Sequence, residues 1–349
     1  MLTYIFPSSL SIVAALIHII YQMMIYEVCF KFIKMNKNKL LQKLRESLKA
    51  GKLTKESFIN RAMDIHRLLF NYTEIIKNTD VNKISITPNG LSFFIGDEAI
   101  EMFIPPEDKR VAPIEIMNFG KYEPNETIVM NLISSDAKHI FDIGANIGYY
   151  SIYFAKRYPN SIVHSFEPVK TNYSYLKQNI LANDVESQVL TYNLALSDSM
   201  GDTDFFIPPN NGTNASMINV SNDVNFKKEI TKMSTLDQFC KDQNIKPNFI
   251  KCDTEGSELL VFQGAKKILL IDKPVIFSEL LRKWSKPFGY HPNEMITFFN
   301  KLGYLCFGIG ENKVRHMEEV TEDTVETNYV FLHSNAHVEI LNKLKSLKW

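Results

Sequence analysis

The chain has 349 residues, 45% of them hydrophobic, and its 39 Lys and Arg are balanced by 39 Asp and Glu. This apolar content supports a packed core and excludes a disordered chain. The zero net charge gives no general electrostatic attraction to nucleic acid, so we expect no nucleic-acid partner. The four cysteines form no C-x-x-C pair and no zinc-like spacing, which indicates free thiols and a cytoplasmic location.

The first 34 residues have an unusual composition. Residues 1–26 contain no Asp, Glu, Lys or Arg, and the mostly apolar run Leu10–Phe30 is long enough to cross a bilayer at about 1.5 Å per residue. Lysines follow this run, so a spanning helix would leave the rest of the chain attached to the cytoplasmic face of the membrane. Polar interruptions favour the alternative, a buried helix packed on the same chain or on a second subunit. We predict an N-terminal helical region over residues 1–80, with membrane contact through residues 1–34 as one alternative.

A second helix and a small β extension follow. Thr54 is placed to cap a helix that reaches about Lys77, and its apolar residues recur in steps of three and four. This apolar seam indicates either a homo-oligomer or packing against the same chain. The run Ile84–Ile95, centred on Pro88-Asn89-Gly90, predicts a β-hairpin in an extension over residues 81–120.

From Lys138 onward, short apolar segments alternate with helical patterns. The segments that read as strands are Ile140–Ile143, Ile162–Phe166, Gln188–Asn193, Phe249–Cys252 and Val275–Glu279. The alternation predicts an α/β fold, with a mostly parallel Rossmann-like sheet and helices on both faces, in a domain over residues 121–349. A late strand, Val330–His333, is expected in an antiparallel hairpin that closes the sheet.

The stretch Phe141–Gly148 reads as a strand, a glycine-rich turn and the start of a helix over Tyr149–Tyr158. Gly144 and Gly148 lack the Cβ that would hold a cofactor away from the backbone. The strand ends in Asp142, whose carboxylate repels the pyrophosphate of a dinucleotide but suits an ammonium or sulfonium group. The sequence therefore predicts S-adenosyl-L-methionine rather than NAD, with Asp142 and Asn146 at the methionine end.

Two later positions complete the predicted cofactor site. Glu167 ends the second strand, one β-α unit after the glycine turn, where a carboxylate can accept hydrogen bonds from both ribose hydroxyls. After the third strand, Ser197 and Asp198 are expected beside the adenine. Asp198 could equally cap the following turn, because Asp is common in turns.

The candidate catalytic residues are mainly carboxylates. Asp253 and Glu255 follow the strand Phe249–Cys252, at the edge where open α/β sheets bind ligands. Either could take a proton, orient the acceptor or hold a divalent metal, with Glu279 at the end of the next strand as support. The alternative for all three is helix capping. His291 is a further candidate base on a loop, where an isolated histidine is more often structural.

Five motifs in order carry a family resemblance. The runs Phe-Asp-Ile-Gly-Ala-Asn-Ile-Gly (141–148), Phe-Glu-Pro (166–168), Ala-Leu-Ser-Asp (195–198), Thr-Leu-Asp (235–237) and Ile-Lys-Cys-Asp-Thr-Glu-Gly (250–256) resemble the FkbM family of S-adenosylmethionine-dependent methyltransferases over about residues 122–303. The resemblance implies a class I methyltransferase fold and, usually, O-methylation of a hydroxyl on a sugar or polyketide-like product. It also implies that the pair Tyr122-Glu123 borders the cofactor. Cys252 and Thr254 depart mildly from the family pattern and leave the carboxylates in place.

We therefore predict a cytoplasmic O-methyltransferase that acts on a hydroxyl of a small-molecule or glycan acceptor, most simply a sugar or glycoconjugate. The long polar loop Pro208–Ser221 is expected to be a lid over a polyhydroxylated acceptor. The alternative is a non-catalytic, membrane-associated partner that keeps the methyltransferase fold. The intact acidic residues argue against it, because a decayed site would be expected to lose some of them.

Overall fold

The computed structural model describes residues 37–209, 212–220 and 225–347. The segment predicted for membrane contact, residues 1–34, lies outside the described residues. Within the described ranges, no helix is both long and apolar enough to cross a bilayer. Contacts divide the chain after Ile75 into two compact units, which are described separately.

The described part of the first unit is a pair of helices, α2 (Lys37–Lys49) and α3 (Lys55–Ile75). Gly51 has a φ of +68°, which lets the chain turn between them. Thr54 caps α3 as predicted, because its side chain accepts a hydrogen bond from the amide of Ser57 at 3.1 Å. No residue of α3 is fully buried. The two alternatives for its apolar seam, a homo-oligomer or packing against the same chain, therefore stay predictions.

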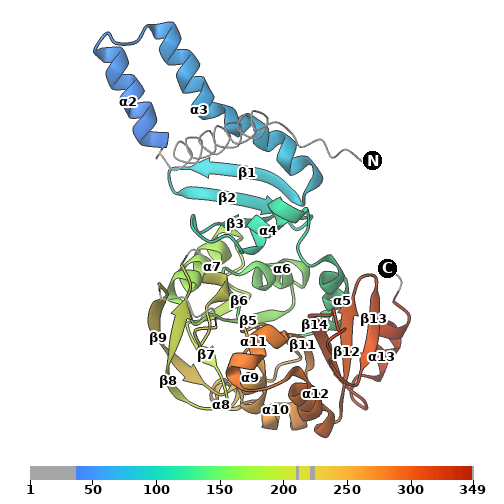
Figure 1. The fold of residues 1–349 in the computed structure, drawn as a ribbon. Helices are drawn as coiled ribbons and strands as arrows, with labels where there is room; N and C mark the ends of the chain where they lie inside the picture. The colour runs from blue at the N-terminus through green and yellow to red at the C-terminus, as the bar shows by residue number, and fades with distance from the viewer. Residues whose placement is uncertain (1–36, 210–211, 221–224, 348–349) are drawn as a thin grey trace, which may run out of the picture. The chain divides into compact units, whose positions relative to one another are not determined.

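The second unit begins with the β extension, a three-stranded antiparallel sheet in the order β1-β2-β3 (Figure 1). Its strands are β1 (Val81–Thr87), β2 (Gly90–Ile95) and β3 (Ile100–Phe103), preceded by a 3-10 turn and followed by α4 (Ala112–Phe119). The predicted hairpin is confirmed, since Thr87 pairs with Gly90 across a turn made by Pro88 and Asn89. The third strand is an addition to the prediction.

Two asparagines attach this extension to α7 (Lys170–Ala182), one within the helix and one at its C-terminal cap. The side chain of Asn183 accepts a hydrogen bond from the Glu101 amide at 2.9 Å and donates one to the Glu101 carbonyl at 2.7 Å. The side chain of Asn179 accepts a hydrogen bond from the Phe103 amide at 2.7 Å and donates one to the Phe103 carbonyl at 3.3 Å. It also donates to the carbonyl of Ile147 at 2.8 Å. Main-chain groups at the edge of β3 are thus satisfied by side chains of a helix.

The main sheet has eight strands in the order β13-β12-β14-β11-β10-β4-β5-β6. Strands β11, β10, β4, β5 and β6 are parallel, whereas β14 runs antiparallel to both β11 and β12. The bounds are β4 (His139–Ile143), β5 (Ile162–Phe166), β6 (Val189–Tyr192), β10 (Phe249–Cys252), β11 (Val275–Glu279), β12 (Tyr304–Gly310), β13 (Lys313–Met317) and β14 (Asn328–His333). This is the class I methyltransferase arrangement, so the predicted fold class is confirmed.

Helices cover both faces of this sheet, and each face has its own hydrophobic cluster. One face packs against α5 (Pro124–Ser134), α6 (Tyr149–Arg157), α7 and α13 (Val338–Lys345), together with the β extension. The other packs against α8 (Leu236–Gln243), α9 (Glu258–Gln263), α10 (Lys266–Ile271) and α12 (Pro292–Lys301). The central strands are therefore buried on both sides, as their continuous apolar sequences require.

A second small sheet was not predicted. It contains β7 (Ala195–Leu196), β8 (Gly201–Ile207) and β9 (Lys227–Ser234), in the order β7-β9-β8. The predicted lid loop connects β8 to β9, and its described part, residues 212–220, is held in place by main-chain bonds between Phe206 and Ser216. Charged and polar residues dominate β8 and β9, so the apolar alternation that indicates a strand is weak there.

The order of the strands determines where a ligand can bind. From β4 the chain moves outward through β5 to β6, then returns to β10 on the opposite side of β4. The loops after β4 and β10 therefore diverge, and a crevice forms between them at the carboxyl edge of the sheet.

Candidate active site

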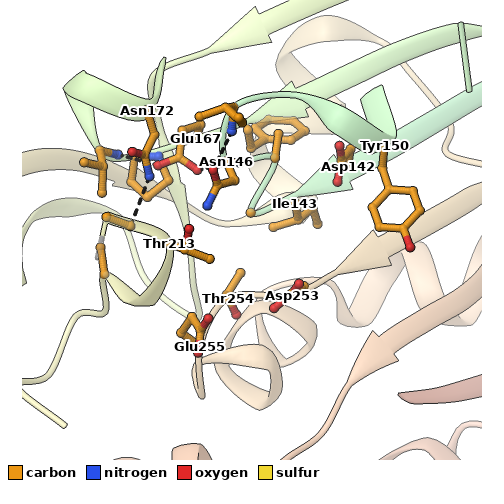
Figure 2. Close-up of a pocket in the computed structure, with 18 of the residues that line it drawn as sticks. Asp142, Ile143, Asn146, Tyr150, Glu167, Asn172, Thr213, Asp253, Thr254 and Glu255 are labelled. Atoms are coloured by element: carbon orange, nitrogen blue, oxygen red, sulfur yellow. Dashed lines mark hydrogen bonds between the residues drawn. The ribbon is translucent and has the colours of Figure 1, made fainter. Parts of the chain in front are cut away.

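A pocket occupies this crevice. It is lined by the turn after β4, the segment after β5, the loop after β10 and residues of the 212–217 segment. Figure 2 shows Asn146, Glu167 and Asn172 on one side of the pocket, and Asp253, Thr254 and Glu255 on the other.

Glycine at position 144 is required by the packing of the turn. Gly144 has a φ of +78°, and its amide donates to the carbonyl of Phe166 at 3.0 Å. A Cβ at this position would fall on the main-chain oxygen of Asp253. Gly148, with a φ of +96°, faces the side chain of Leu176, which would lie 2.6 Å from a Cβ. These glycines allow close approach between protein segments, in addition to the approach to a cofactor expected from the sequence.

Glu167 lies at the predicted place, where β5 ends at the pocket. Its two carboxylate oxygens accept hydrogen bonds from the amides of Asn146, at 2.8 Å, and Val169, at 2.9 Å. Burial raises the pKa of Glu167 to about 7, although these two amides act in the opposite direction. Each oxygen keeps a second lone pair, so this fixed carboxyl group can still bind a hydroxyl.

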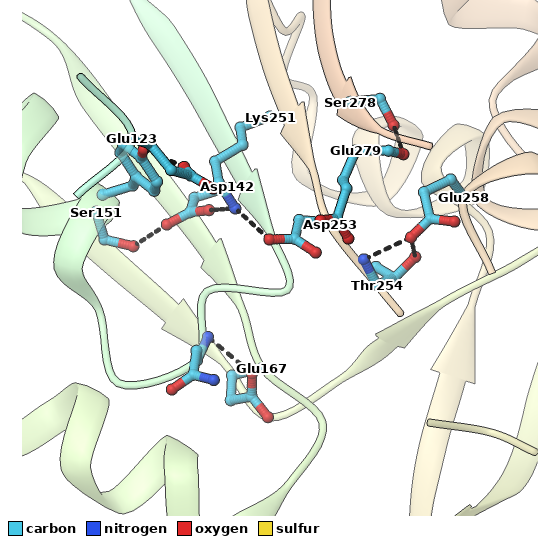
Figure 3. Close-up of polar contacts among 12 residues, drawn as sticks. Glu123, Asp142, Ser151, Glu167, Lys251, Asp253, Thr254, Glu258, Ser278 and Glu279 are labelled. Carbon is cyan, nitrogen blue, oxygen red and sulfur yellow. Dashed lines mark hydrogen bonds and ion pairs between the residues drawn. The ribbon is translucent and has the colours of Figure 1, made fainter. Parts of the chain in front are cut away.

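Asp142 is paired with a lysine that the sequence analysis missed. Asp142 and Lys251 are register partners on β4 and β10, and both are almost fully buried. The Nζ of Lys251 lies 3.4 Å from Oδ1 of Asp142 and 3.6 Å from Oδ2 of Asp253, as Figure 3 shows. Burial favours the neutral amine, but the two carboxylates outweigh it and raise the pKa of Lys251. Two signals could have revealed this residue: a charge inside an apolar strand, and a position two residues before Asp253, hence on the same face.

The Asp142 carboxylate also accepts a hydrogen bond from Ser151 on α6 at 2.6 Å, through Oδ2. Within the described residues, Oδ1 accepts no hydrogen bond and has only the ion pair with Lys251. This oxygen is therefore the atom through which Asp142 could contact a cationic group in the pocket.

The structure brings three of the predicted catalytic carboxylates together. The side chain of Asp253 is 31% exposed and belongs to the pocket lining. Glu255 has a φ of +54°, and its Oε2 is buried without a hydrogen-bond partner in the described part of the chain. Burial, reinforced by the negative charge of Asp253, raises the pKa of both Glu255 and Glu279 well above the usual value. A carboxyl group with a raised pKa keeps its proton to higher pH, and in that form it can donate a hydrogen bond.

A fourth carboxyl group, Glu123, lies beside these residues. It accepts a hydrogen bond from the hydroxyl of Tyr150, and burial raises the pKa of Glu123 to about 7. Burial and the nearby Glu123 raise the pKa of Tyr150 well above 10. The neighbouring Tyr122 and Tyr150 line the pocket.

The loop after β10 takes its shape from Glu258. One oxygen of this buried carboxylate accepts hydrogen bonds from the amides of Thr254, at 2.8 Å, and Gly256, at 3.1 Å (Figure 3 shows the Thr254 contact). The hydroxyl of Tyr290 donates to the other oxygen at 3.3 Å. This support fixes the positive φ of Glu255 and holds Asp253 at the pocket.

Five predicted site residues lie outside the pocket lining: Gly148, Ser197, Asp198, Glu279 and His291. Ser197 is buried, and Asp198 lines a separate surface depression. His291 is exposed and caps α12, since its Nδ1 accepts a hydrogen bond from the amide of Asn293 at 3.2 Å and its own amide donates to Glu294. We therefore leave Ser197, Asp198 and His291 out of the proposed catalytic and cofactor contacts.

The pocket also has an apolar part that the sequence did not reveal. Its lining includes Val169, Leu194, Ala195, Phe205 and Met217. These residues come from segments far apart in the chain, and the unpredicted small sheet brings them together. A flat, apolar ring system could be buried among them.

Asp253 and Glu255 were also predicted as alternatives for holding a metal. Among the described residues, no group of three or more His, Cys, Asp or Glu is arranged to bind a metal ion. Metal dependence stays a question for experiment.

Comparison with known families agrees with this geometry. Residues 142–306 match the family model described as "Methyltransferase FkbM domain". The chain therefore contains an FkbM methyltransferase domain. The matched region begins at Asp142 and includes Glu167, Asp253 and Glu255, so these acidic pocket residues belong to the FkbM domain.

Individual relatives are more distant. "Methyltransferase sdnD" from Sordaria araneosa is 35% identical over 79 residues, which cover 23% of this chain and 30% of that protein. The chain is also similar to a solved structure, methyltransferase FkbM from Methylobacillus flagellatus KT, with 16% identity and a TM-score of 0.37 over 56% of this chain and 44% of the other. An O-methyltransferase from Bacillus cereus, in complex with SAH, has 13% identity and a TM-score of 0.36 over 60% and 81%.

Proposed function

We propose that this protein is an S-adenosylmethionine-dependent O-methyltransferase whose acceptor is a hydroxyl of a sugar or glycoconjugate. The observation that carries the proposal is the placement of Asp253 across the pocket from Glu167 and Asn146 (Figure 2). Glu167 and Asn146 can bind a nucleoside on one side of the pocket, and the carboxylate of Asp253 can contact the acceptor on the other.

The pocket residues suit this cofactor. The carboxyl group of Glu167 can bind the ribose hydroxyls, and the apolar group around Phe205 can cover the adenine. Asp142 lines the pocket, and its Oδ1, which lacks a hydrogen bond within the described ranges, is the proposed contact for the cationic methionine end. S-adenosylmethionine supplies an activated methyl group, and the protein has to orient the acceptor and exclude water.

Asp253 is the proposed general base. When the acceptor oxygen forms its bond to the methyl carbon, the hydroxyl proton has to leave, and the Asp253 carboxylate receives it. Lys251 keeps this carboxylate oriented from 3.6 Å away. Glu255, which lines the pocket and whose pKa is raised, would position the acceptor as a hydrogen-bond donor. Glu279, outside the lining, would contribute only through its charge interaction with Asp253 and Glu255.

The first test is cofactor binding. S-adenosylhomocysteine should raise the melting temperature and NAD should not, because only a ligand that binds the folded state shifts its stability. A shift by NAD alone would contradict the proposal.

The second test is transfer of labelled methyl groups from S-adenosylmethionine into glycan fractions. Asp253→Asn should lose at least about 100-fold in turnover, the usual scale for a general base, and still bind S-adenosylhomocysteine. The matched control is Asp198→Asn, at an acidic residue outside the pocket, which should keep its turnover. Full turnover by Asp253→Asn would remove this residue from the mechanism.

A further inference from the structure

A second groove lies next to the loop after β10, residues 253–257, here called the acidic loop, on the other side of the 212–220 segment. Its lining comes from β8, from the segment that follows it and from α11 (Arg282–Ser285). The residues in it are aromatic, apolar and amide-bearing, with one cation: Phe206, Pro208, Asn214, Ile218, Asn219, Val220, Lys283 and Trp284.

The 212–220 segment separates this groove from the main pocket. Thr213 and Met217 line the main pocket, whereas Asn214 and Ile218 line the groove. The hydroxyl of Ser216, between them, donates to the main-chain oxygen of Glu255 at 3.0 Å. The segment is therefore fixed to the acidic loop, and a ligand in the groove lies one segment away from Glu255.

The helix α11 makes the second connection. A Cβ on Gly256 would fall on the main-chain oxygen of Trp284, so the acidic loop and α11 are in direct backbone contact. The positive charge of Lys283 also reaches Glu255, where it opposes the effect of burial on the carboxyl group. The groove and the acidic end of the main pocket thus form two neighbouring binding regions.

The chemistry of the groove fits one class of ligand. The Nζ of Lys283 lies 4.9 Å from the ring centre of Trp284. The face of an aromatic ring carries partial negative charge and attracts the C–H bonds on the face of a sugar ring. Lys283 forms no ion pair with a carboxylate among the described residues, and its ammonium can therefore bind an anion. The carboxylate of Asp204 on β8 is already paired with Lys228.

We propose that this groove binds an acidic sugar residue adjacent to the methylated one, with the ring face on Trp284 and the carboxylate at Lys283. The proposal rests on the proposed function, and it specifies the acceptor as an anionic glycan. The neutral residue to be methylated would then extend toward Asp253, past Ser216.

The protein contains two tryptophans, Trp284 and Trp349. In a Trp349→Phe background, fluorescence therefore reports on Trp284 alone. The probes are cellobiouronic acid and cellobiose, which differ by one carboxylate, added in the presence of saturating S-adenosylhomocysteine. We expect the acid to change the fluorescence and to bind more tightly than cellobiose, by up to about five-fold, the upper end for an exposed charge pair.

Lys283→Ala in this background should abolish the preference for the acid. Lys286→Ala removes an exposed lysine outside the groove and should preserve the preference. Equal binding of both sugars, no fluorescence response, or an unchanged preference in Lys283→Ala would each overturn the proposal.

Calorimetry with S-adenosylhomocysteine distinguishes a failure of the groove proposal from a failure of the proposed function. If the cofactor product binds and the sugars give no response, the groove proposal fails and the proposed function stands. If S-adenosylhomocysteine itself does not bind, both proposals fail together.

Discussion

Gly144 and Asp253 are in direct contact through their backbones, because the main-chain oxygen of Asp253 occupies the space of a Cβ on Gly144. The turn expected to hold the cofactor and the loop expected to hold the acceptor are therefore one packed unit. A change in one loop has to move the other.

Gly144→Ala should thus be strongly destabilising. The control is Gly289→Ala, because Gly289 has nearly the same φ, +79° against +78°, but no atom lies within 4 Å of the position that its Cβ would take. The positive φ alone should cost Gly289→Ala about 1–2 kcal/mol. Gly144→Ala should lose clearly more in urea unfolding and should weaken S-adenosylhomocysteine binding. Equal losses in the two variants would show that the contact with Asp253 can relax freely.

Removing Lys251 should leave two buried carboxylates without their cation. Lys251→Met is expected to lower the free energy of unfolding by about 3–5 kcal/mol, the range for breaking a buried pair from one side. Adding Asp142→Asn should recover part of this loss. Lys246→Met is the control, since Lys246 is 78% exposed and pairs with Asp272 at the surface. If the double variant were no more stable than Lys251→Met, the pair would not be coupled.

Glu167 should make stability depend on pH near neutrality. Its folded pKa of about 7 lies above the ordinary value of 4.5, so the folded state keeps the proton longer than the unfolded state. The stability of the wild type relative to Glu167→Gln should therefore fall as pH rises from about 4.5 to about 7, by up to roughly 3 kcal/mol. Denaturant unfolding at pH 5 and pH 8 measures this difference. Glu186→Gln, at an exposed glutamate, should leave the pH dependence unchanged.

Asn179→Ala should detach the edge of β3. It removes the hydrogen bonds to Phe103 and Ile147 and leaves buried main-chain groups unsatisfied, at about 1–3 kcal/mol for each group. Gln178→Ala, at the exposed neighbouring position on α7, should cost less than about 0.5 kcal/mol. Comparable losses in both variants would mean that the asparagine contacts contribute little to docking.

The sequence predicted the central sheet well because buried parallel strands are short, apolar and regularly spaced. The run Phe249–Cys252 and the glycine turn after Phe141 have these properties, and both lie where expected. The small sheet was missed because β8 and β9 carry polar residues on most positions, so only three-dimensional pairing identifies them.

For the site, local sequence identified the acids but not their partners. Asp142, Asp253 and Glu167 stand at strand ends, which a motif can locate. The pairing of Asp142 with Lys251 depends on the register between β4 and β10, which lie 109 positions apart at these two residues (251 − 142). His291 was a candidate because any histidine on a loop can act as a base. Only the structure shows that its side chain accepts a hydrogen bond from an amide at the start of α12.

The side chain of Asn179 links the small extension to the turn at the pocket. Asn179 binds the amide of Phe103 in the small extension and the carbonyl of Ile147 in the turn at the pocket. Occupancy of the pocket that steadies the turn should therefore slow hydrogen exchange at Phe103, in a different sheet. Removing the whole 81–120 segment would also open the pocket itself, because Arg110, Val111 and Ala112 form part of its wall.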